Sequence, residues 1–445
     1  MPRPKSAGIR LERKKDASLL NWNLKRPYPP EKIRVPIPND SLPCVHVGET
    51  VHLGQKIAEA QGVYGVSVHA GMAGVVEKIA AFPSLLGCES LMIEIRRQGE
   101  SKPASSPEIH KGWEEIPEKE LRWIFQHSGL VTTDARMEPV HAKLQRHSGA
   151  RTIVINGCEP EPYITCEQVL AMSHPLEILR GAELLRRVCG AVPTPINFRG
   201  SEIGAVPTTL SEKKITVGAE KIVFVFESSN LETIELFKSK IYFLKWTHVE
   251  TRTVPALYPQ GLESMLTQEG AVVFPASTAF ATYEAVALGK PFYERVVTVG
   301  GECVVEPRSL WLPIGISFHD AIHACKGVMR EPNKVLMGGP MAGTAQGKTE
   351  VPVTAGTTAI LALPGEVARE EPEEPCIRCN LCADHCPVSL MPAMITLAAE
   401  QKEFAIAEAW DASACIECGI CSYVCPSKRP MLKLIRQARE GVIHG

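Results

Sequence analysis

The segment "CIRCNLCADHCP" (376–387) is repeated in its cysteine spacing by "CIECGICSYVCP" (415–426). Both read C-x2-C-x2-C-x3-C-P, a run in which three cysteines hold one [4Fe–4S] cluster and the fourth usually ligates a second cluster. The spacing therefore predicts two clusters, and zinc is the alternative that fits it less well. The expected ligands are Cys376, Cys379, Cys382 and Cys425 for one cluster, and Cys415, Cys418, Cys421 and Cys386 for the other.

The residues around the two runs favour helices. "LMPAMITLAAEQKEFAIAEAW" (390–410) and "RPMLKLIRQAREGV" (429–442) combine helical periodicity with strong helix formers. The preceding "EVAREEPEEP" (366–375) is acidic and contains prolines, which is typical of a linker. We therefore expect residues 366–445 to form a helical two-cluster ferredoxin domain that carries single electrons.

Composition limits the function of the remaining chain. The 445 residues carry a net charge of −2 and are 44% hydrophobic, which suits several domains with their own cores and argues against a nucleic-acid partner. No apolar run approaches the ~20 residues of a membrane-spanning helix. We expect most cysteines outside the two runs to be buried, reduced thiols. These are Cys44, Cys88, Cys158, Cys166, Cys189, Cys303 and Cys325.

The N-terminal half begins with a basic arm and a β-rich module. Residues 1–40 contain "MPRPKSAGIRLERKKDASLL", which lacks the apolar stretch of a signal peptide. We expect a solvated arm, or a basic contact to a membrane surface or partner subunit. In residues 41–110, valines alternate with turn glycines as in a lipoyl-like β-sandwich. The central "SVHAGMAG" (67–74) has no lysine for a swinging arm, which favours a docking role.

Residues 118–270 alternate strands (151–157, 221–229) with helices (174–191, 230–241), which predicts a parallel α/β domain covered on both faces. Ligands bind such sheets at the carboxyl ends of the strands. "INGCEPEPYIT" (155–165) begins at such an end, and an acidic loop in solvent is the alternative to a pocket. The candidate pocket residues are Asn156, Glu159, Glu161 and Tyr163.

Residues 271–365 are again β-rich and contain one helix, at 317–328, which suggests a β-grasp fold. The predicted strands cover 295–301, 309–315, 334–340 and 358–363. His319, His323 and Cys325 lie on or near the helix, but no further metal ligand has fitting spacing. We expect these three side chains to pack or to face solvent.

This order of parts resembles the C subunit of the Rnf complex, a membrane ion-translocating ferredoxin:NAD⁺ oxidoreductase. The cobalamin-reductase flavoproteins of propanediol-utilising microcompartments look similar. The resemblance covers nearly the whole chain, and the β-grasp part corresponds to an SLBB-like domain. The stretches that carry it are "YPPEK", "NGCEPEPYIT", "YPQGLES", "LGKPFYERVVTV", "PIG", "GGPMAG" and both cysteine runs.

The resemblance implies a redox function. The α/β domain would bind FMN and exchange hydride with NAD(H), and the clusters would pass electrons to membrane subunits. The chain would then lie peripherally on the cytoplasmic side of the cell membrane. A glycine-rich loop cradles the flavin phosphate in the family, because glycine lets backbone N–H groups approach closely. The implied pocket residues are Lys143, Asn156, Glu159, Glu161, Tyr163 and Glu263.

The sequence departs from the family at this pocket. "GLVTTDARMEPVHAK" (129–143) keeps Gly129 and Lys143 but replaces four glycines, and "VVFPASTAF" (272–280) replaces an Asn-Val-Gly-Thr turn. The residues in place of the four glycines are Thr132, Asp134, Ala135 and Met137, and those in the turn are Pro275, Ala276 and Ser277. These departures predict a weakened or lost flavin and nicotinamide site beside an intact cluster domain. Lys143, Glu159, Glu161, Tyr258 and Glu263 remain in place and oppose that interpretation.

Three functions follow from the sequence. The first is an electron-transfer subunit that receives electrons from a soluble redox protein, without hydride chemistry of its own. The second is a complete FMN-containing NADH-oxidising subunit. The third is a soluble cobalamin reductase, for which the family resemblance is the only support.

Overall fold

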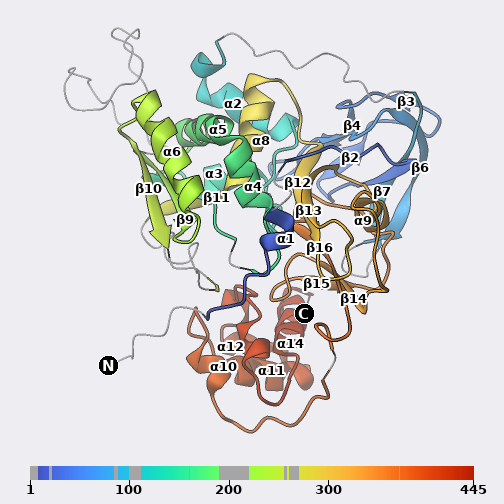
Figure 1. The fold of residues 1–445 in the computed structure, drawn as a ribbon. Helices are drawn as coiled ribbons and strands as arrows, with labels where there is room; N and C mark the ends of the chain where they lie inside the picture. Colours follow the sequence, from blue (N-terminus) through green and yellow to red (C-terminus); the bar gives the residue numbers. More distant parts are fainter. Residues whose placement is uncertain are drawn as a thin grey trace.

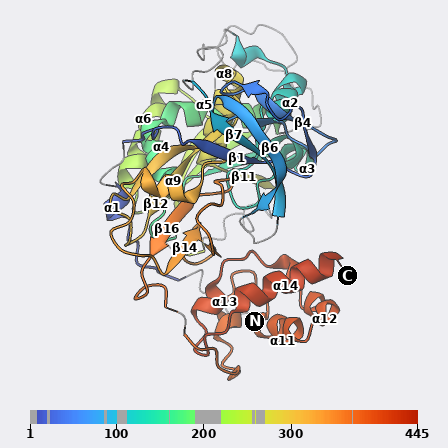
Figure 2. The ribbon, with the colours of Figure 1, turned by 90° about the vertical axis from the view of Figure 1, so that its right-hand side faces the viewer.

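A computed structural model describes residues 9–19, 23–84, 89–99, 112–159, 161–189, 220–254, 258–259, 270–369 and 371–444. Three β-containing units form an upper body, and the C-terminal helices form a separate unit below it (Figure 1). The second view gives the same arrangement, with the C-terminal helices on one side of the body (Figure 2). The predicted multidomain α/β and α+β class is confirmed.

The first unit is a β-sandwich made of two antiparallel sheets. One sheet has the order β1-β7-β6-β3 and the other β2-β4-β5. The strands are β1 Lys32–Pro36, β2 Ser41–Pro43, β3 Thr50–Val51, β4 Lys56–Ala60, β5 Val68–His69, β6 Gly74–Pro83 and β7 Glu89–Arg97. β1 pairs with β7 along its whole length, so the boundary predicted at residue 40 is wrong, since the sandwich already includes Lys32.

The second unit contains a parallel sheet of order β10-β9-β8-β11. Its strands are β8 Thr152–Asn156, β9 Lys221–Glu227, β10 Val249–Val254 and β11 Ala271–Pro275. The helices are α2 Glu118–His127, α3 Val140–Arg146, α4 Cys166–Ser173, α5 Pro175–Val188, α6 Leu231–Leu244 and α8 Ala276–Ala287, after a short turn of helix η1 Trp113–Glu115. β11 pairs with β8, so the boundary predicted at 270/271 is also wrong, because it separates this strand and α8 from their own domain.

Side chains alternate between the two faces of this sheet. Ile153 and Ile155 of β8 join the main core with the helices, whereas Val154 lies in a smaller cluster on the opposite face. Helices α5 and α8 pack so closely on the main face that a side chain at Gly181 would overlap the Ala279 carbonyl. The described helices thus contribute to the core on one face of the sheet.

The third unit is the predicted β-grasp sheet, of order β13-β12-β16-β14-β15. Its elements are β12 Glu294–Gly300, β13 Arg308–Pro313, α9 Phe318–His323, β14 Lys334–Met337, β15 Thr344–Gln346 and β16 Ala359–Leu363. His319 and His323 are exposed and Cys325 is buried, as expected. The sandwich and the β-grasp sheet share one hydrophobic cluster, so the two units pack as one block.

The C-terminal unit is helical, as predicted. It comprises α10 Leu381–Asp384, α11 Pro392–Glu400, α12 Phe404–Ala409, η2 Ala412–Ala414, α13 Ile420–Tyr423 and α14 Met431–His444. The expected helix over 390–410 is divided in two at Gln401–Glu403. Its core combines four cysteines with small and branched apolar residues: Cys382, Cys386, Cys421, Cys425, Leu390, Ile395, Ala398, Ala399, Ala407, Ala412, Met431, Ile435 and Ala438.

The basic arm is not a solvated arm in the described range 9–19, which includes the short helix α1 Asp16–Leu19. Lys15 is buried, and its Nζ donates to the Glu159 carbonyl. Lys14 pairs with Glu302 at 2.8 Å. These two lysines have partners within the molecule, whereas the alternative of a membrane or partner contact stays a prediction.

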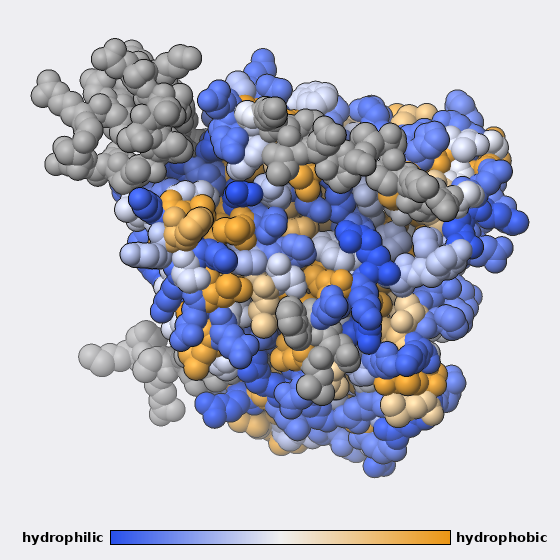
Figure 3. Space-filling model, turned by 45° about the horizontal axis from the view of Figure 1, so that its top comes forward, coloured by the Kyte–Doolittle hydropathy of each residue, from blue (hydrophilic) through white to orange (hydrophobic). Residues whose placement is uncertain are grey.

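The described surface is mostly hydrophilic on the upper face, where hydrophobic side chains are scattered in small groups (Figure 3). Cys44 is exposed, whereas the other described cysteines outside the two motifs are buried. Cys88 lies outside the described residues. None of the helices in the described ranges has both the length and the apolar character needed to span a bilayer.

Candidate metal centres and nucleotide pocket

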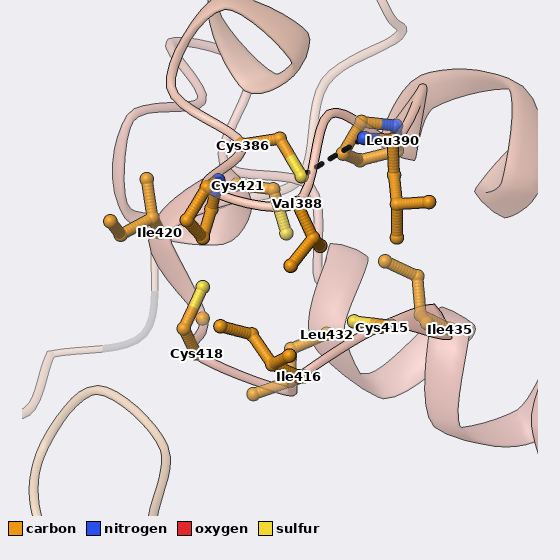
Figure 4. Close-up of a pocket in the computed structure, with 13 residues that line it drawn as sticks. Cys386, Val388, Leu390, Cys415, Ile416, Cys418, Ile420, Cys421, Leu432 and Ile435 are labelled. Carbon is orange, nitrogen blue, oxygen red and sulfur yellow. Dashed lines mark hydrogen bonds between the residues drawn. The ribbon is translucent and has the colours of Figure 1, made fainter. Parts of the chain in front are cut away.

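Four cysteine thiols drawn from both motifs surround one cavity in the C-terminal unit. Cys386, Cys415, Cys418 and Cys421 all line it, and the space between atoms there amounts to about 350 Å³, including a part that is open to solvent. Figure 4 shows their sulfur atoms on different sides of this space. The remaining lining is apolar and includes Val388, Leu390, Pro392, Ile416, Ile420, Leu432 and Ile435.

Backbone amides donate to two of these sulfurs. The Leu390 N–H lies 3.3 Å from Cys386 Sγ, and the Glu417 N–H lies 3.3 Å from Cys415 Sγ. Hydrogen bonds of this kind stabilise thiolates and adjust the reduction potential of iron–sulfur clusters. Burial raises the pKa of Cys421 to about 12 and that of Cys418 to about 11. A bound iron–sulfur cluster would reverse this effect, since a metal-bound thiol is deprotonated.

The two motifs share one backbone pattern. Arg378 and Asn380 in the first motif have left-handed φ angles of 55° and 65°, and Glu417 and Gly419 at the equivalent positions have 56° and 74°. A short helix follows in each copy, α10 and α13. Left-handed residues turn successive N–H groups towards one side, which creates concave sites for negative groups. A repeated sequence thus gives a repeated sulfur-binding loop.

The other predicted set lies nearer the surface. Cys379 is exposed and Cys376 half-buried, whereas Cys382 and Cys425 are buried. Burial raises the pKa of Cys382, and the charges of Cys376 and Cys379 add to the effect, so these three thiols are neighbours. Within the described ranges, no three His, Cys, Asp or Glu side chains converge on a point suited to a single ion. Cys386, Cys415, Cys418 and Cys421, which we call the second thiol set, instead stand around the wall of a cavity. This arrangement fits a cluster.

The C-terminal unit docks on the body next to Cys418. The Tyr258 hydroxyl donates to the Cys418 carbonyl at 2.5 Å. Gly419 lies against the Met341 carbonyl, which a side chain at 419 would overlap. Arg436 donates to the Ala342 carbonyl at 3.0 Å. The second thiol set therefore faces the body through Tyr258 and the loop that contains Met341.

Glu161, a predicted pocket residue, holds that loop from the other side. Its Oε2 accepts from the backbone N–H groups of Met341 at 2.8 Å and Ala342 at 3.3 Å. Burial raises the pKa of Glu161, while the two N–H groups oppose the rise. Glu161 thus connects the α/β domain to the β-grasp loop on which the C-terminal unit rests.

The other predicted pocket residues that the structure describes make contacts with separate parts of the chain. Asn156 Oδ1 accepts from the Cys158 N–H at 2.9 Å, and the Tyr163 hydroxyl donates to Glu302 at 3.0 Å. Glu159 accepts from the Glu167 N–H at 2.8 Å and the Gln168 N–H at 3.0 Å, at the start of α4. Lys143 is buried, with its Nζ 5.1 Å from the centre of the Phe274 ring. Glu263 lies outside the described residues.

The loop at 129–143 uses its own backbone amides. Thr132 N–H donates to the Glu138 carbonyl at 2.8 Å, and Glu138 N–H donates to Thr132 Oγ1 at 3.0 Å. Arg136 N–H and Met137 N–H both donate to Asp134, the first to its side chain and the second to its carbonyl. Four amides that could face a phosphate therefore already have acceptors within the loop.

The same loop is joined to the turn that follows β11. Thr133 N–H donates to Thr278 Oγ1 at 3.1 Å. Thr133 Oγ1 lies 2.6 Å from Ser277 Oγ and 2.9 Å from Thr278 Oγ1. All three side chains are buried. The loop at 129–143 and the turn after β11 are thus bonded to each other through Thr133, Ser277 and Thr278.

A third layer closes the loop from the β-grasp side. Gly356 packs on the Asp134 carbonyl and the Met137 side chain, both of which a side chain at 356 would overlap. The buried Arg295 guanidinium donates to the Thr133 carbonyl at 2.8 Å. The residues present therefore do not fit an FMN phosphate. The backbone amides of the loop at 129–143 already donate to acceptors within the loop, and Asp134 brings a carboxylate into it.

Sequence reasoning missed the buried partners of this loop. Glu167 lies outside the motifs, and Arg295 lies within "LGKPFYERVVTV" (288–299) but was given no role, although charged residues inside predicted buried elements require partners. Ser277 donates from its N–H to Glu167 Oε2 at 2.8 Å and from its hydroxyl to Oε1. Ser277 stands in the mostly apolar stretch "VVFPASTAF" (272–280), and this serine was the signal that could have indicated a buried polar contact.

Comparisons with known families divide the chain in the same order. A model of the RnfC barrel sandwich hybrid domain matches residues 5–100, and one of the Nuo51 FMN-binding domain matches 125–272. The SLBB domain matches 296–345, and the 4Fe-4S dicluster domain matches 375–429.

Whole-chain relatives cover most of the sequence. The C subunit of the Na⁺-translocating ferredoxin:NAD⁺ oxidoreductase complex of Acetobacterium woodii is 29% identical over 93% of this chain and 91% of its own. The C subunit of the proton-translocating complex of Clostridium ljungdahlii is 28% identical over 83% and 78%. The C subunit of the ion-translocating oxidoreductase complex of Rhodobacter capsulatus is 30% identical over 82% and 69%.

A solved structure, an NAD⁺-reducing [NiFe]-hydrogenase in the H2-reduced state, covers 77% of this chain and 63% of the matched chain. Its identity is 14% and its TM-score 0.45, so it carries no argument about function.

Proposed function

The chain belongs to the RnfC family, the C subunits of the ion-translocating oxidoreductase (Rnf) complexes, and on this premise we propose that it relays single electrons through two [4Fe–4S] clusters to other subunits of such a complex. The observation that carries the proposal is the cavity lined by Cys386, Cys415, Cys418 and Cys421. A cysteine of the first motif stands among three of the second, as two linked clusters require.

We assign the ligands accordingly. The second cluster would be held by Cys386, Cys415, Cys418 and Cys421, and the first by Cys376, Cys379, Cys382 and Cys425. Bound clusters supply one-electron carriage. The chain contributes N–H groups to Cys386 and Cys415, an apolar wall that excludes water, and the Tyr258 contact that fixes Cys418 against the body.

The closed loop at 129–143 supports a relay without flavin chemistry. Thr132, Asp134 and Thr133 use the amide and hydroxyl groups that a phosphate cradle needs, and Glu159 and Glu161 bind backbone amides of the chain itself. We therefore derive no step through FMN or NAD(H) on this chain. The electron donor we propose is a soluble redox protein.

Membership of the family supports a proposal about the position of the protein in the cell. We propose a peripheral subunit on the cytoplasmic side of the membrane, bound by membrane subunits of the complex. The relatives include both Na⁺- and proton-translocating complexes, so similarity to them favours neither ion for this chain.

Cofactor counting tests the proposal. The protein is purified without oxygen, and iron, sulfide and flavin are measured per chain, with electron paramagnetic resonance after dithionite reduction. We expect about eight iron atoms per chain, two interacting reduced-cluster signals and no stoichiometric flavin. Zinc in place of iron would overturn the whole proposal, whereas tight stoichiometric FMN with NADH-dependent dye reduction would restore the hydride-transferring alternative.

A further inference from the structure

Helices α11 and α12 present apolar side chains to solvent. Met391, just before α11, and Met394 and Leu397 within it are 37%, 38% and 40% exposed. Ile406 of α12 and Trp410 just after it are 48% and 40% exposed. We call these five residues the outer apolar face. A helix in a finished soluble surface normally places charged residues at such positions, so this face is suited to a partner.

The outer apolar face lies on the far side of the C-terminal unit. In Figure 2, α14 lies nearer to the body and α11 and α12 lie farther away. The buried side of α11 includes Ile395 and Ala399, which join the core of the unit. The body therefore leaves the face uncovered.

The face begins next to the second thiol set. Leu390 and Pro392 line the cavity with Cys386 and Cys415, and Met391 stands between them in the chain. The body contacts the same set at Cys418. A partner bound at Met391 would thus approach the cavity from the side opposite the body.

The charges around the face indicate what covers it. Within residues 400–411, which contain Ile406 and Trp410 of the face, the acidic side chains Glu403, Glu408 and Asp411 stand against one lysine, Lys402, while Glu400 already pairs with Arg429. An acidic border repels anionic lipid, and membrane-surface helices usually carry Lys or Arg instead. Two copies of the face would bring like charges together in a symmetric contact. A protein with a basic border fits best.

We propose that the outer apolar face docks another subunit of the complex, one that presents an apolar surface bordered by lysine or arginine, and that electrons cross between the second cluster and that subunit there. This inference rests on the proposed function. Buried aromatic and methionine side chains dominate such interfaces, so Trp410 and Met394 are the expected anchors.

Rebinding measurements test the inference. The holoprotein is mixed with membrane vesicles from a strain that keeps the other subunits but lacks this one, and bound protein is measured by sedimentation. Leu397→Glu and Trp410→Glu are expected to weaken binding at least tenfold, with unchanged iron content. Glu403→Lys should weaken binding less and reduce its salt sensitivity. Phe243→Glu, at a 78% exposed position on α6, is the matched control and should bind as the wild type does.

Two further arms identify the occupant. Vesicles of anionic phospholipid without protein should not bind the wild type, and the purified holoprotein should be monomeric. Binding to pure lipid that is lost in Trp410→Glu would overturn the inference, as would a dimer that this variant dissociates. Equal rebinding of wild type and both face variants would overturn the inference alone. A wild type that contains its iron but fails to rebind would count against the proposed function as well.

Discussion

Glu167 is a buried carboxyl group in the centre of the α/β domain. Burial raises its pKa from 4.5 to about 7, the charge of Glu159 adds to the rise, and Ser277 opposes it through two hydrogen bonds. The folded protein therefore holds a proton on Glu167 at pH values where the unfolded chain has released it. The free energy of unfolding must fall as pH rises from 4.5 to 7, by about 3 kcal/mol from this group.

Glu167→Gln removes this titration. We expect the variant to lose the decline in melting temperature between pH 5 and pH 7 that the wild type shows, because a glutamine is neutral throughout. Thermal unfolding at both pH values measures the difference. Glu177→Gln, in the same domain and half-buried, is the control. An identical pH slope in wild type and Glu167→Gln would contradict the assignment.

Cys386 separates the two ways of dividing eight thiols. It belongs to the first motif but lies in the cavity of the second. Cys386→Ala and Cys418→Ala should each remove about half the iron and the same resonance signal, and Cys379→Ala should remove the other signal. Iron analysis and electron paramagnetic resonance of the three reduced variants make the comparison. If Cys386→Ala and Cys379→Ala lost the same signal, each motif would hold its own cluster.

At the residue scale, the sequence predicts most where spacing alone carries the chemistry. The cysteine runs predict which thiols hold each cluster, because three of the four expected ligands lie within one short loop, and this ligand assignment stays a prediction. Glu159 and Glu161 could not be assigned in this way. Their partners are backbone amides at 167–168 and 341–342, which are brought near by folding and leave no signature in the local sequence.

At the scale of elements, the loop at 129–143 has become a self-bonded turn. Thr132 Oγ1 accepts from Glu138 N–H and donates to Asp134 at 2.8 Å. Thr132→Gly removes both bonds and adds backbone freedom to the unfolded chain. We expect a loss of about 1–3 kcal/mol in the free energy of unfolding, with iron content unchanged. Urea unfolding measures the loss. Lys119→Ala, at an exposed position on α2 of the same domain, is the control.

The outcome for Thr132→Gly also tests what holds the loop at 129–143 closed. If Thr132→Gly were as stable as the wild type, its hydrogen bonds would not hold the loop closed. A gain of FMN binding in the same variant would contradict the conclusion that this loop, with its contacts to Ser277 and Thr278, does not fit an FMN phosphate.

Sequence periodicity located most elements but not the limits of domains. β8, β9, α5 and α6 fall within the predicted segments, apart from a few residues at the end of α6. β1 and β11 were assigned to the wrong units, because strand pairing across long separations decides membership, and a short apolar strand carries no label of its sheet. The division of 390–410 into two helices was also missed, since Gln401–Glu403 contains neither glycine nor proline.

At the scale of the whole molecule, residues 9–19 tie the body together. Tyr258 and Ile9 exchange backbone hydrogen bonds, Tyr163 N–H donates to the Arg13 carbonyl, and Lys14 reaches Glu302 in the β-grasp unit. These contacts span the α/β domain, the segment that holds Cys418 and the third unit. The arm is thus an internal brace.

Deleting residues 1–19 should lower the melting temperature by several degrees and weaken the attachment of the C-terminal unit, because Lys15 no longer fills its buried site beside Glu159. Calorimetry and limited proteolysis between 366 and 376 provide the measurement. Deletion of residues 1–8 is the control, since it leaves the contacts of residues 9–19 in place. Equal melting temperatures for both deletions would show that the brace contributes nothing.

The internal brace formed by residues 9–19 has a consequence for folding during translation. Lys14 and Glu302 are separated by 288 positions, so the earliest segment to emerge must wait for one of its partners through most of translation. At 5–20 residues per second the delay is roughly 15 to 60 s. During that interval Lys14, in a segment rich in lysine and arginine, lacks its partner Glu302. The nascent chain can complete this contact only after the β-grasp unit has left the ribosomal exit tunnel.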